Sequence, residues 1–341
     1  MARLNWSPSS LPWLRGRTYL VTGGNTGIGY WTVHHLARHG ATVYMTSRSL
    51  EKGTQAIASI KSSLSAAPGP NPDLDRDCDN DPDSIRIHLV VMDLMSLSSV
   101  AAGATHILTQ CTSLHGIVNS AGIMATPLAM SQDGYESQFQ TNYLSHWLLT
   151  YLLLPLLEST ARSSSSSPSL AAGIPTPTGT TPVRVVNVSS TGHTATLKEG
   201  ITFADTSLST KFTFRRYAQS KLANILHSKS LATKYADAGI WSISLHPGNV
   251  DTQLNTSAWG GSSLTPILRC LGVYITPEQG SYNSLWAVAS PDVSANMSGQ
   301  YFMPVGVPKP PSKLASNSAL ADKLWDWTAQ EMKRKGFIED A

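Results

Sequence analysis

The sequence predicts an α/β protein with one doubly wound parallel sheet and helices on both faces. Short, nearly continuous apolar runs recur along the chain, each is followed by a stretch of helical periodicity, and the first ends in a glycine-rich turn. Such apolar runs are typical of parallel strands that are covered on both faces. Their crossovers should be right-handed, with a ligand site beyond the carboxyl ends of the strands.

The elements follow one another in a regular alternation. The expected strands span residues 18–24, 41–48, 85–94, 115–122, 183–190, 240–248 and 298–306. The expected helices span residues 28–40, 50–64, 96–111, 134–160, 217–239 and 279–290, with a helical tail at about 315–336. We find no internal repeat and no linker, so we expect a single domain over residues 1–341, with its core at about 17–305.

Two segments interrupt this alternation and are expected to be surface insertions. Residues 67–84 are rich in Pro and Asp, and residues 162–182 are a Ser-rich stretch of low complexity. The longest apolar run, at 147–157, is shorter than the roughly 20 residues of a membrane span, and Pro155 interrupts it. We expect this run to be core or a helix-pairing face of a homo-oligomer.

Composition and charge exclude several classes of protein. Lys plus Arg number 25 and Asp plus Glu 22, a formal charge of +3 that implies neither a nucleic acid nor an anionic membrane as partner. Cys78, Cys111 and Cys270 are widely spaced, so neither a disulfide framework nor a metal site is expected. The N-terminal residues lack the apolar core of a signal peptide. We expect a soluble, cytoplasmic protein without a transmembrane segment.

The glycine-rich turn TGGNTGIG follows the first expected strand and opens the first helix. Its glycines, Gly23, Gly27 and Gly29, allow a tight turn and a close approach of the backbone to a diphosphate, beside Asn25 and Ile28. The alternative is an ordinary strand-to-helix turn. The position at the first strand–helix junction favours a dinucleotide.

The end of the second expected strand favours NADP(H) over NAD(H). It reads Thr46-Ser47-Arg48, without the carboxylate that binds a ribose 2′-hydroxyl in NAD sites. Arg48 can instead donate two hydrogen bonds to a 2′-phosphate, and Lys52 adds a second positive charge. The alternative is that Arg48 is a solvated loop cation.

Two polar residues at later strand ends are candidates for the adenosine side. Asp93 can accept a hydrogen bond from an adenine amino group, and either Asp93 or Ser96 can also cap the following helix. Asn119 lies where a strand end is expected to face the cofactor.

Three further residues suit proton transfer. Tyr217 and Lys221 are one turn apart on a helix face, and Ser190 ends the preceding strand. A phenol has a pKa near 10, and a neighbouring ammonium should lower that pKa. A serine hydroxyl can hydrogen-bond a substrate oxygen and hold it against the tyrosine. The alternative for Tyr217 and Lys221 is a solvated helix face, which the glycine turn and Ser190 disfavour.

These motifs together resemble the short-chain dehydrogenase/reductase superfamily, which has a Rossmann-type fold. The resemblance rests on TGGNTGIG, NSAG, NVSS, YAQSK and HPGNVDT, which occur in the family's order between about Arg17 and Val305. The segments SRSLEKG and YAQSKLANIL are most similar to retinol-dehydrogenase-like and fungal members, which usually use NADP(H).

The resemblance implies a role for each matching position. Tyr217 is implied as general acid/base, Lys221 as the residue that tunes it and binds the nicotinamide ribose, Ser190 as the group that polarises the carbonyl, and Asn142 as part of a proton relay. The cofactor contacts implied are Gly23, Gly27, Ile28 and Gly29 at the diphosphate, Asp93 and Asn119 at the adenosine side, and Val250 and Thr252 at the nicotinamide. Ser120 replaces the second asparagine of the family's usual Asn-Asn-Ala-Gly, so a local structural bond is expected to be lost.

The resulting prediction is an NADP(H)-dependent oxidoreductase that interconverts a ketone or aldehyde and an alcohol, with secondary metabolism as one setting. Residues 253–276 mix glycines with apolar side chains and either cover a lipophilic substrate or pack against the core or a partner. Two other functions stay open: a carbon–carbon double-bond reductase and a non-enzymatic nucleotide-sensing scaffold.

Overall fold

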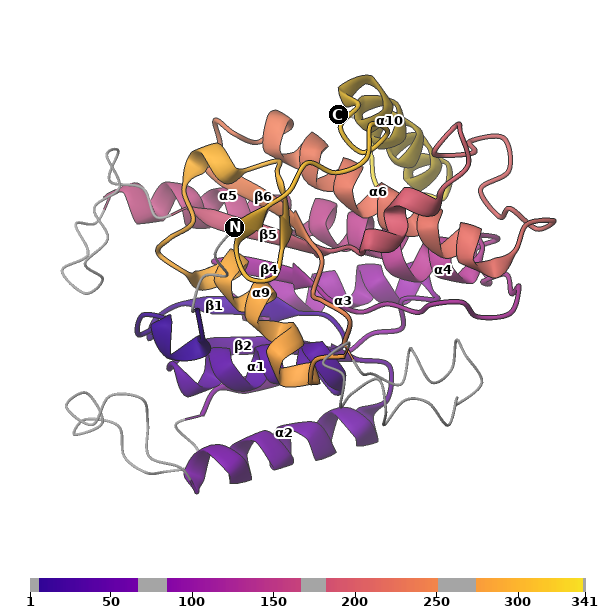
Figure 1. Cartoon of the computed structure of the whole chain (residues 1–341). Helices are drawn as coiled ribbons and strands as arrows, with labels where there is room; N and C mark the ends of the chain where they lie inside the picture. Colours follow the sequence, from indigo (N-terminus) through magenta and orange to yellow (C-terminus); the bar gives the residue numbers. More distant parts are fainter. Residues whose placement is uncertain (1–5, 67–84, 167–181, 251–273, 340–341) are drawn as a thin grey trace.

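The computed structural model describes residues 6–66, 85–166, 182–250 and 274–339, and these form one twisted sheet with helices on both sides (Figure 1). The sheet has eight strands in the order β3-β2-β1-β4-β5-β6-β7-β8. The strands are β1 Thr18–Val21, β2 Thr42–Ser47, β3 Ile87–Val91, β4 Gly116–Asn119, β5 Val183–Val188, β6 Ile240–Leu245, β7 Tyr301–Met303 and β8 Val307–Pro308. All neighbours are parallel except β7 and β8, which confirms the predicted fold class.

The strand order reverses next to β1. From β1 the chain proceeds to β2 and β3 on one side, and then returns to β4, β5 and β6 on the other. The connections that follow β1 and β4 therefore run in opposite directions and leave a crevice at the carboxyl ends of these two strands. Ligands bind at this point in open α/β sheets.

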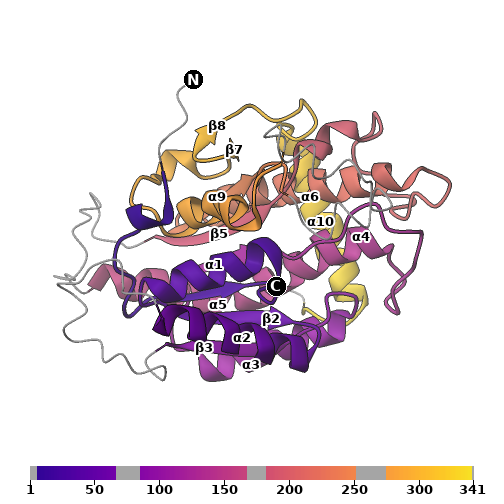
Figure 2. The ribbon, with the colours of Figure 1, turned by 60° about the horizontal axis from the view of Figure 1, so that its bottom comes forward.

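Each face of the sheet has its own helices and its own apolar core (Figures 1 and 2). One face carries α1 Gly27–Arg38, α2 Leu50–Ser65 and α9 Pro277–Ala289. The other carries α3 Leu97–Gln110, α5 Ser145–Ser166 and α6 Thr213–Lys234, and α10 Ser318–Arg334 packs on α6. Side chains alternate between the two cores along a strand, as Leu20 and Val21 do in β1.

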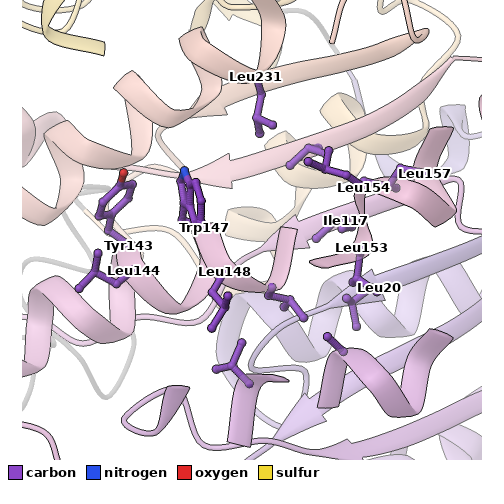
Figure 3. Close-up of a cluster of buried hydrophobic side chains, with 14 of the residues drawn as sticks. Leu20, Ile117, Tyr143, Leu144, Trp147, Leu148, Leu153, Leu154, Leu157 and Leu231 are labelled. Atoms are coloured by element: carbon purple, nitrogen blue, oxygen red, sulfur yellow. The ribbon is translucent and has the colours of Figure 1, made fainter. Parts of the chain in front are cut away.

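The apolar run at 147–157 belongs to the core beneath α5 (Figure 3). Leu148 and Leu153 are fully buried in one cluster with Leu20 of β1, and the Trp147 ring lies 5.1 Å from that of Trp325 in α10. The chain's own helices thus cover this run. No helix within the described ranges is long and apolar enough to cross a bilayer.

The end of α5 differs from the prediction. The helix continues through Pro155, which is exposed, as the expected helix at 134–160 does, but it ends at Ser166, so the first residues of the predicted insertion 162–182 are helical. A proline removes one backbone donor and displaces one turn, and the burial of the opposite face of α5 outweighs that cost.

Other details of the fold also differ from the predictions. Helix α6 begins at Thr213, before the expected start at Tyr217, and α9 begins at Pro277, where Thr276 and Gln279 form a capping box. The short antiparallel strand β8 was not predicted. Trp6, Leu11 and Leu14, which precede the expected core, are buried in it.

Candidate active site

The glycine-rich turn lies at the carboxyl end of β1, beside the point where the strand order reverses. Gly23 has a φ of +66°, and its N–H donates to Thr46 Oγ1 at 3.2 Å. A Cβ on Gly29 would lie 2.3 Å from the carbonyl oxygen of Gly23. Only glycine allows this close return of the chain. The turn therefore leaves backbone where side chains would otherwise fill the space.

Helix α1 starts directly after this turn, so its N-terminus lies at the same edge of the sheet. Gly27 is the first helical residue, and Thr26, the N-cap, makes no side-chain capping bond. The first turn contains no acidic residue. The N–H groups at this helix end and the positive end of the helix dipole suit an anion such as a diphosphate. Asn25 lies half-buried in the turn.

Ile28 and Val250 lie together beside the glycine turn. A Cβ on Gly280 of α9 would lie 3.2 Å from Ile28 Cγ1 and 2.6 Å from Val250 Cγ2. The two predicted cofactor residues are thus brought together by a close approach of α9. Thr252 and residues 253–273 of the predicted substrate segment lie outside the described residues.

The predicted phosphate-binding residues lie on the turn between β2 and α2. Arg48 and Lys52 are exposed, and neither forms an ion pair with a carboxylate of the described ranges. Asp93 is also exposed at the end of β3, and its Oδ1 accepts the N–H of Met95 at 2.9 Å. The N-cap of α3 is Ser96, so Asp93 is not the cap.

Asn119 faces inward instead of toward the expected cofactor. Its side chain is 2% exposed, and its amide donates to Asn187 Oδ1 at 2.9 Å and to Thr150 Oγ1 at 3.2 Å. Both bonds use Nδ2, whereas Oδ1 of Asn119 is buried and has no hydrogen-bond partner among the described residues. The cofactor contact of Asn119 stays a prediction.

The two serines at the end of β5 point in different directions. Ser189 is buried and donates to the carbonyl of Lys221 at 2.7 Å, whereas Ser190 is half-buried and its hydroxyl lies beside the Tyr217 ring: a Cβ on Gly192 would be 3.3 Å from Ser190 Oγ and 3.1 Å from Tyr217 Cε1. Ser190 Oγ also accepts the N–H of Gly192 at 3.0 Å. This glycine therefore keeps the space beside the phenol open.

Lys221 lies behind Tyr217 and is 5% exposed. Its Nζ donates to the carbonyl of Val188 at 2.9 Å and lies 5.7 Å from the centroid of the Tyr217 ring. Burial lowers the pKa of Lys221 to about 8. Burial raises the pKa of Tyr217, and the bond with Ser190 opposes that rise. The net shift of the Tyr217 pKa is therefore upward, because desolvation outweighs the effect of Ser190. That Lys221 lowers this pKa stays a prediction.

Asn142 lies in a π-helical turn, η4 Gln140–Leu144, between the short helix α4 Ser137–Phe139 and α5. Its Nδ2 donates to the carbonyl of Ile123 and to Ser220 Oγ, both at 2.9 Å, and its Oδ1 accepts the N–H of Ile123 at 2.8 Å. A Cβ on Gly122 would lie 3.1 Å from Asn142 Oδ1 and 3.4 Å from Lys221 Nζ. The structure thus brings Asn142 and Lys221 to one place. Such π turns are frequent at functional sites.

Several residues of this site were missed in the sequence. Ser220 holds Asn142, Asn224 donates to the carbonyl that Lys221 also contacts, and Gly192 leaves room beside Tyr217. Ser220 and Asn224 were both detectable in principle, because they lie close to Lys221 on the same helix. Ser220 directly precedes Lys221, and Asn224 follows it by three residues. Within the described ranges, no group of three or more His, Cys, Asp or Glu side chains is placed to hold a metal ion.

Comparison with known proteins identifies the family. Residues 17–166 match the family model for short chain dehydrogenase. The chain is 44% identical over 339 residues to the short-chain dehydrogenase/reductase drtF of Aspergillus calidoustus, covering 97% of this chain and 98% of that relative. It is 30% identical to retinol dehydrogenase 12 of Mus musculus, over 91% of this chain and 84% of that protein.

A solved structure shows the same architecture. An uncharacterized protein from Mycobacterium Paratuberculosis is 28% identical and superposes with a TM-score of 0.67, covering 96% of this chain and 97% of the other. The motif order, the parallel sheet and these matches agree. The chain belongs to the short-chain dehydrogenase/reductase family of oxidoreductases.

Proposed function

We propose that this protein is an NADP(H)-dependent oxidoreductase that interconverts a ketone or aldehyde and an alcohol. The observation that carries the proposal is that Ser190, Tyr217 and Lys221 lie together at the end of β5. A Cβ on Gly192 would be 3.3 Å from Ser190 Oγ and 3.1 Å from Tyr217 Cε1, and Lys221 Nζ is 5.7 Å from the centroid of the Tyr217 ring. These groups combine a proton donor, a cation and a hydrogen-bond donor for a substrate oxygen.

The residues at the glycine turn fit a dinucleotide. The space kept free by Gly23 and Gly29, together with the uncapped start of α1, suits a diphosphate. Ile28 would contact the diphosphate, Val250 the nicotinamide end, and Lys221 the ribose next to Tyr217. When bound, the coenzyme supplies the hydride for reduction or accepts it in oxidation.

The exposed cations at the turn after β2 support NADP(H). Arg48 and Lys52 bring two positive charges to the end of β2, and the strand end Thr46-Ser47-Arg48 carries no carboxylate that would oppose a 2′-phosphate. The carboxylate in the first turn of α2, Glu51, accepts a hydrogen bond from Gln55. Arg48 can donate a pair of hydrogen bonds to such a phosphate.

Proton transfer would follow from the buried groups. In reduction, Tyr217 gives its proton to the oxygen of the substrate carbonyl, while Ser190 donates a hydrogen bond to that oxygen and holds it in place. Lys221 stabilises the phenolate that Tyr217 leaves, because a nearby ammonium favours the ionised form. In oxidation, Tyr217 accepts the proton of the alcohol.

We propose a lipophilic substrate. The Phe214 ring is half-buried, with its centroid 5.7 Å from that of Tyr217, and the nearby Phe212 is 76% exposed at the start of α6. A relative with 30% identity carries the name retinol dehydrogenase 12. An apolar substrate would cover both phenylalanines and remove their apolar surface from water.

The test is Tyr217→Phe, assayed with NADPH against an aldehyde, a ketone and an enone. Turnover should fall roughly 100- to 10,000-fold, because the proton donor is lost, while NADPH binding, followed by fluorescence, should persist. Tyr235→Phe, at the end of the same helix, is the matched control and should behave as the wild type. Turnover that survives in Tyr217→Phe would refute the assignment, and activity on the enone alone would indicate double-bond reduction.

A further inference from the structure

A buried histidine, His146, joins the glycine turn to the residues proposed for proton transfer. His146 begins in the first turn of α5 and is 1% exposed. Its Nε2 lies 2.9 Å from Thr22 Oγ1, and its Nδ1 lies 3.0 Å from the main-chain carbonyl oxygen of Asn142. One ring thus contacts the residue that opens the glycine turn and the residue at the centre of the π turn.

The neighbours of His146 determine where its proton lies. Thr22 Oγ1 accepts the N–H groups of Ser120 and Ala121 at 2.9 and 3.0 Å, which uses both of its lone pairs. The Asn142 carbonyl can only accept, so Nδ1 of His146 must carry a hydrogen. In a neutral ring Nε2 is then an acceptor. The hydroxyl of Thr22 donates to it at 2.9 Å in preference to its other acceptor, the Val118 carbonyl oxygen, which lies at 3.5 Å.

A charged ring does not fit this arrangement. Protonation of Nε2 would direct an N–H at the Thr22 oxygen, which has no free lone pair. Two titratable groups of α6 act on the ring as well: Lys221 disfavours its charged form, and His227 is electrostatically coupled to it. Burial, with a smaller contribution from Lys221, lowers the pKa of His146 to about 4, and the main-chain bond to Asn142 opposes that shift. His146 is therefore neutral near pH 7.

Thr22 and Asn142, the two partners of His146, each bond to further residues of the site. Thr22 ties the carboxyl end of β1 to the turn after β4, where Ala121 packs against Gly23. Asn142 uses its side chain to hold Ile123 and Ser220, and Ser220 directly precedes Lys221. His146 is the one residue that bonds to both Thr22 and Asn142 among the described residues.

We propose that His146 is a positioning residue, which as a neutral ring holds the glycine turn and the Asn142 turn in one fixed arrangement. Thr22 sets the turn that would receive the coenzyme, and Asn142 sets the surroundings of Lys221. The inference rests on the proposed function, because the two turns matter together only when hydride and proton are transferred at one carbon.

Two conservative variants separate the two contacts. The amide of His146→Asn takes the place of Nδ1 and keeps the bond to Asn142, whereas the longer His146→Gln reaches Thr22 in place of Nε2. His146→Asn should raise the KM for NADPH about tenfold with kcat little changed, and His146→Gln should lower kcat about tenfold with that KM little changed, since each loses one buried hydrogen bond.

His227→Phe is the matched control, because His227 is buried nearby and no hydrogen bond to its ring nitrogens is present among the described residues. His227→Phe should keep both kcat and the KM for NADPH of the wild type. If both His146 variants lower only the melting temperature, with KM and kcat as in the wild type, His146 is merely structural and the proposal is wrong.

A second measurement does not depend on turnover. In protein labelled with ¹⁵N at its 10 histidines, the signal absent from His146→Asn should show a protonated Nδ1 and a bare Nε2, and should stay neutral at pH 6. A ring charged at pH 6, or protonated at Nε2, would overturn the proposal. If the wild type shows no NADPH-dependent turnover but this signal appears, the proposed function fails while the hydrogen-bond assignment stands.

Discussion

The Tyr217 end of the site and the Arg48 end are built in opposite ways. Tyr217, Lys221 and Asn142 are buried, and Lys221 and Asn142 are hydrogen-bonded to the main chain of neighbouring segments. Arg48 and Lys52 are exposed on the turn after β2. Burial makes the pKa values and the packing of the first set depend on one another, whereas exposed cations can change with little effect on the fold.

The largest effect is expected for Lys221→Met, which removes the buried ammonium but keeps a side chain of similar size. We expect kcat to fall roughly 1,000-fold. Because the folded pKa of Lys221 is lowered to about 8, the folded state binds fewer protons than the unfolded state between that pH and the ordinary lysine pKa of about 10.4. Stability rises with pH across this window, and below it the full cost of the buried charge is present. The buried ammonium therefore costs stability at neutral pH.

Lys221→Met should consequently melt at a higher temperature than the wild type at pH 7, while losing turnover. The carbonyl of Val188 keeps Asn224 as a donor at 3.2 Å, so no unpaired acceptor is created. Lys229→Met, on the same helix, is the matched control. Wild-type activity should decline above a pH of about 8. If Lys221→Met kept the wild-type kcat, the buried end of the site would be no more important for turnover than the exposed end.

Gly29→Ala changes the glycine turn, which lies between the Tyr217 end and the Arg48 end of the site. The new Cβ would lie 2.3 Å from the carbonyl oxygen of Gly23, so the turn must move. We expect the affinity for NADPH to fall tenfold to about a hundredfold, the range that overpacking produces, and measure it by fluorescence titration. Gly53→Ala is the control, because its Cβ meets only the flexible end of Leu89. Equal affinities in both variants would contradict a diphosphate site at this turn.

Arg48→Ala should separate coenzyme choice from folding. We expect the Kd for NADPH to rise about tenfold, since a charge-assisted hydrogen bond is lost, with little change for NADH or for the melting temperature. Arg86→Ala, an exposed arginine before β3, should change neither coenzyme. The phosphate contact would be refuted by equal losses for NADPH and NADH.

The smallest effect concerns the stability of the buried part in acid. Burial lowers the pKa of His115, His146 and His246 to about 4 each. Between pH 4 and the ordinary histidine pKa of about 6.5, the unfolded state binds more protons, so stability falls as the pH falls. Each histidine contributes up to about 1.4 kcal/mol per pH unit.

His115→Asn tests this slope. Nδ1 of His115 accepts the N–H of Thr18 at 3.0 Å, and an asparagine oxygen can accept it instead, without a ring that titrates. Urea unfolding at pH 7, 6 and 5 should show a shallower loss of stability than in the wild type. An unchanged slope would mean that His115 does not stay neutral in the folded protein.

The parts of the molecule that follow local patterns were predictable. Strand and helix periodicity indicated the parallel sheet, the glycine spacing placed a turn after β1, and the spacing of Tyr217 and Lys221 put both on one face of α6. Ser190 was also placed at a strand end next to Tyr217, as the structure has it.

The parts that depend on distant contacts were not predictable. The contact of Thr22 with His146 joins residues 124 positions apart, and the inward direction of Asn119 depends on Asn187 and Thr150. The net pKa of Tyr217 depends on how deeply the whole fold buries it. No local spacing reports such quantities.

Helix α10 also affects the order in which parts of the protein can fold. From α10, Thr328 bonds to Tyr143 in the π turn at 2.7 Å across 185 positions, and Glu331 bonds to Tyr135 at 2.6 Å across 196 positions. Contacts of such long sequence separation form late in folding. During synthesis, the turn that carries Asn142 therefore leaves the ribosome long before α10, and its final packing waits until α10 has emerged as well.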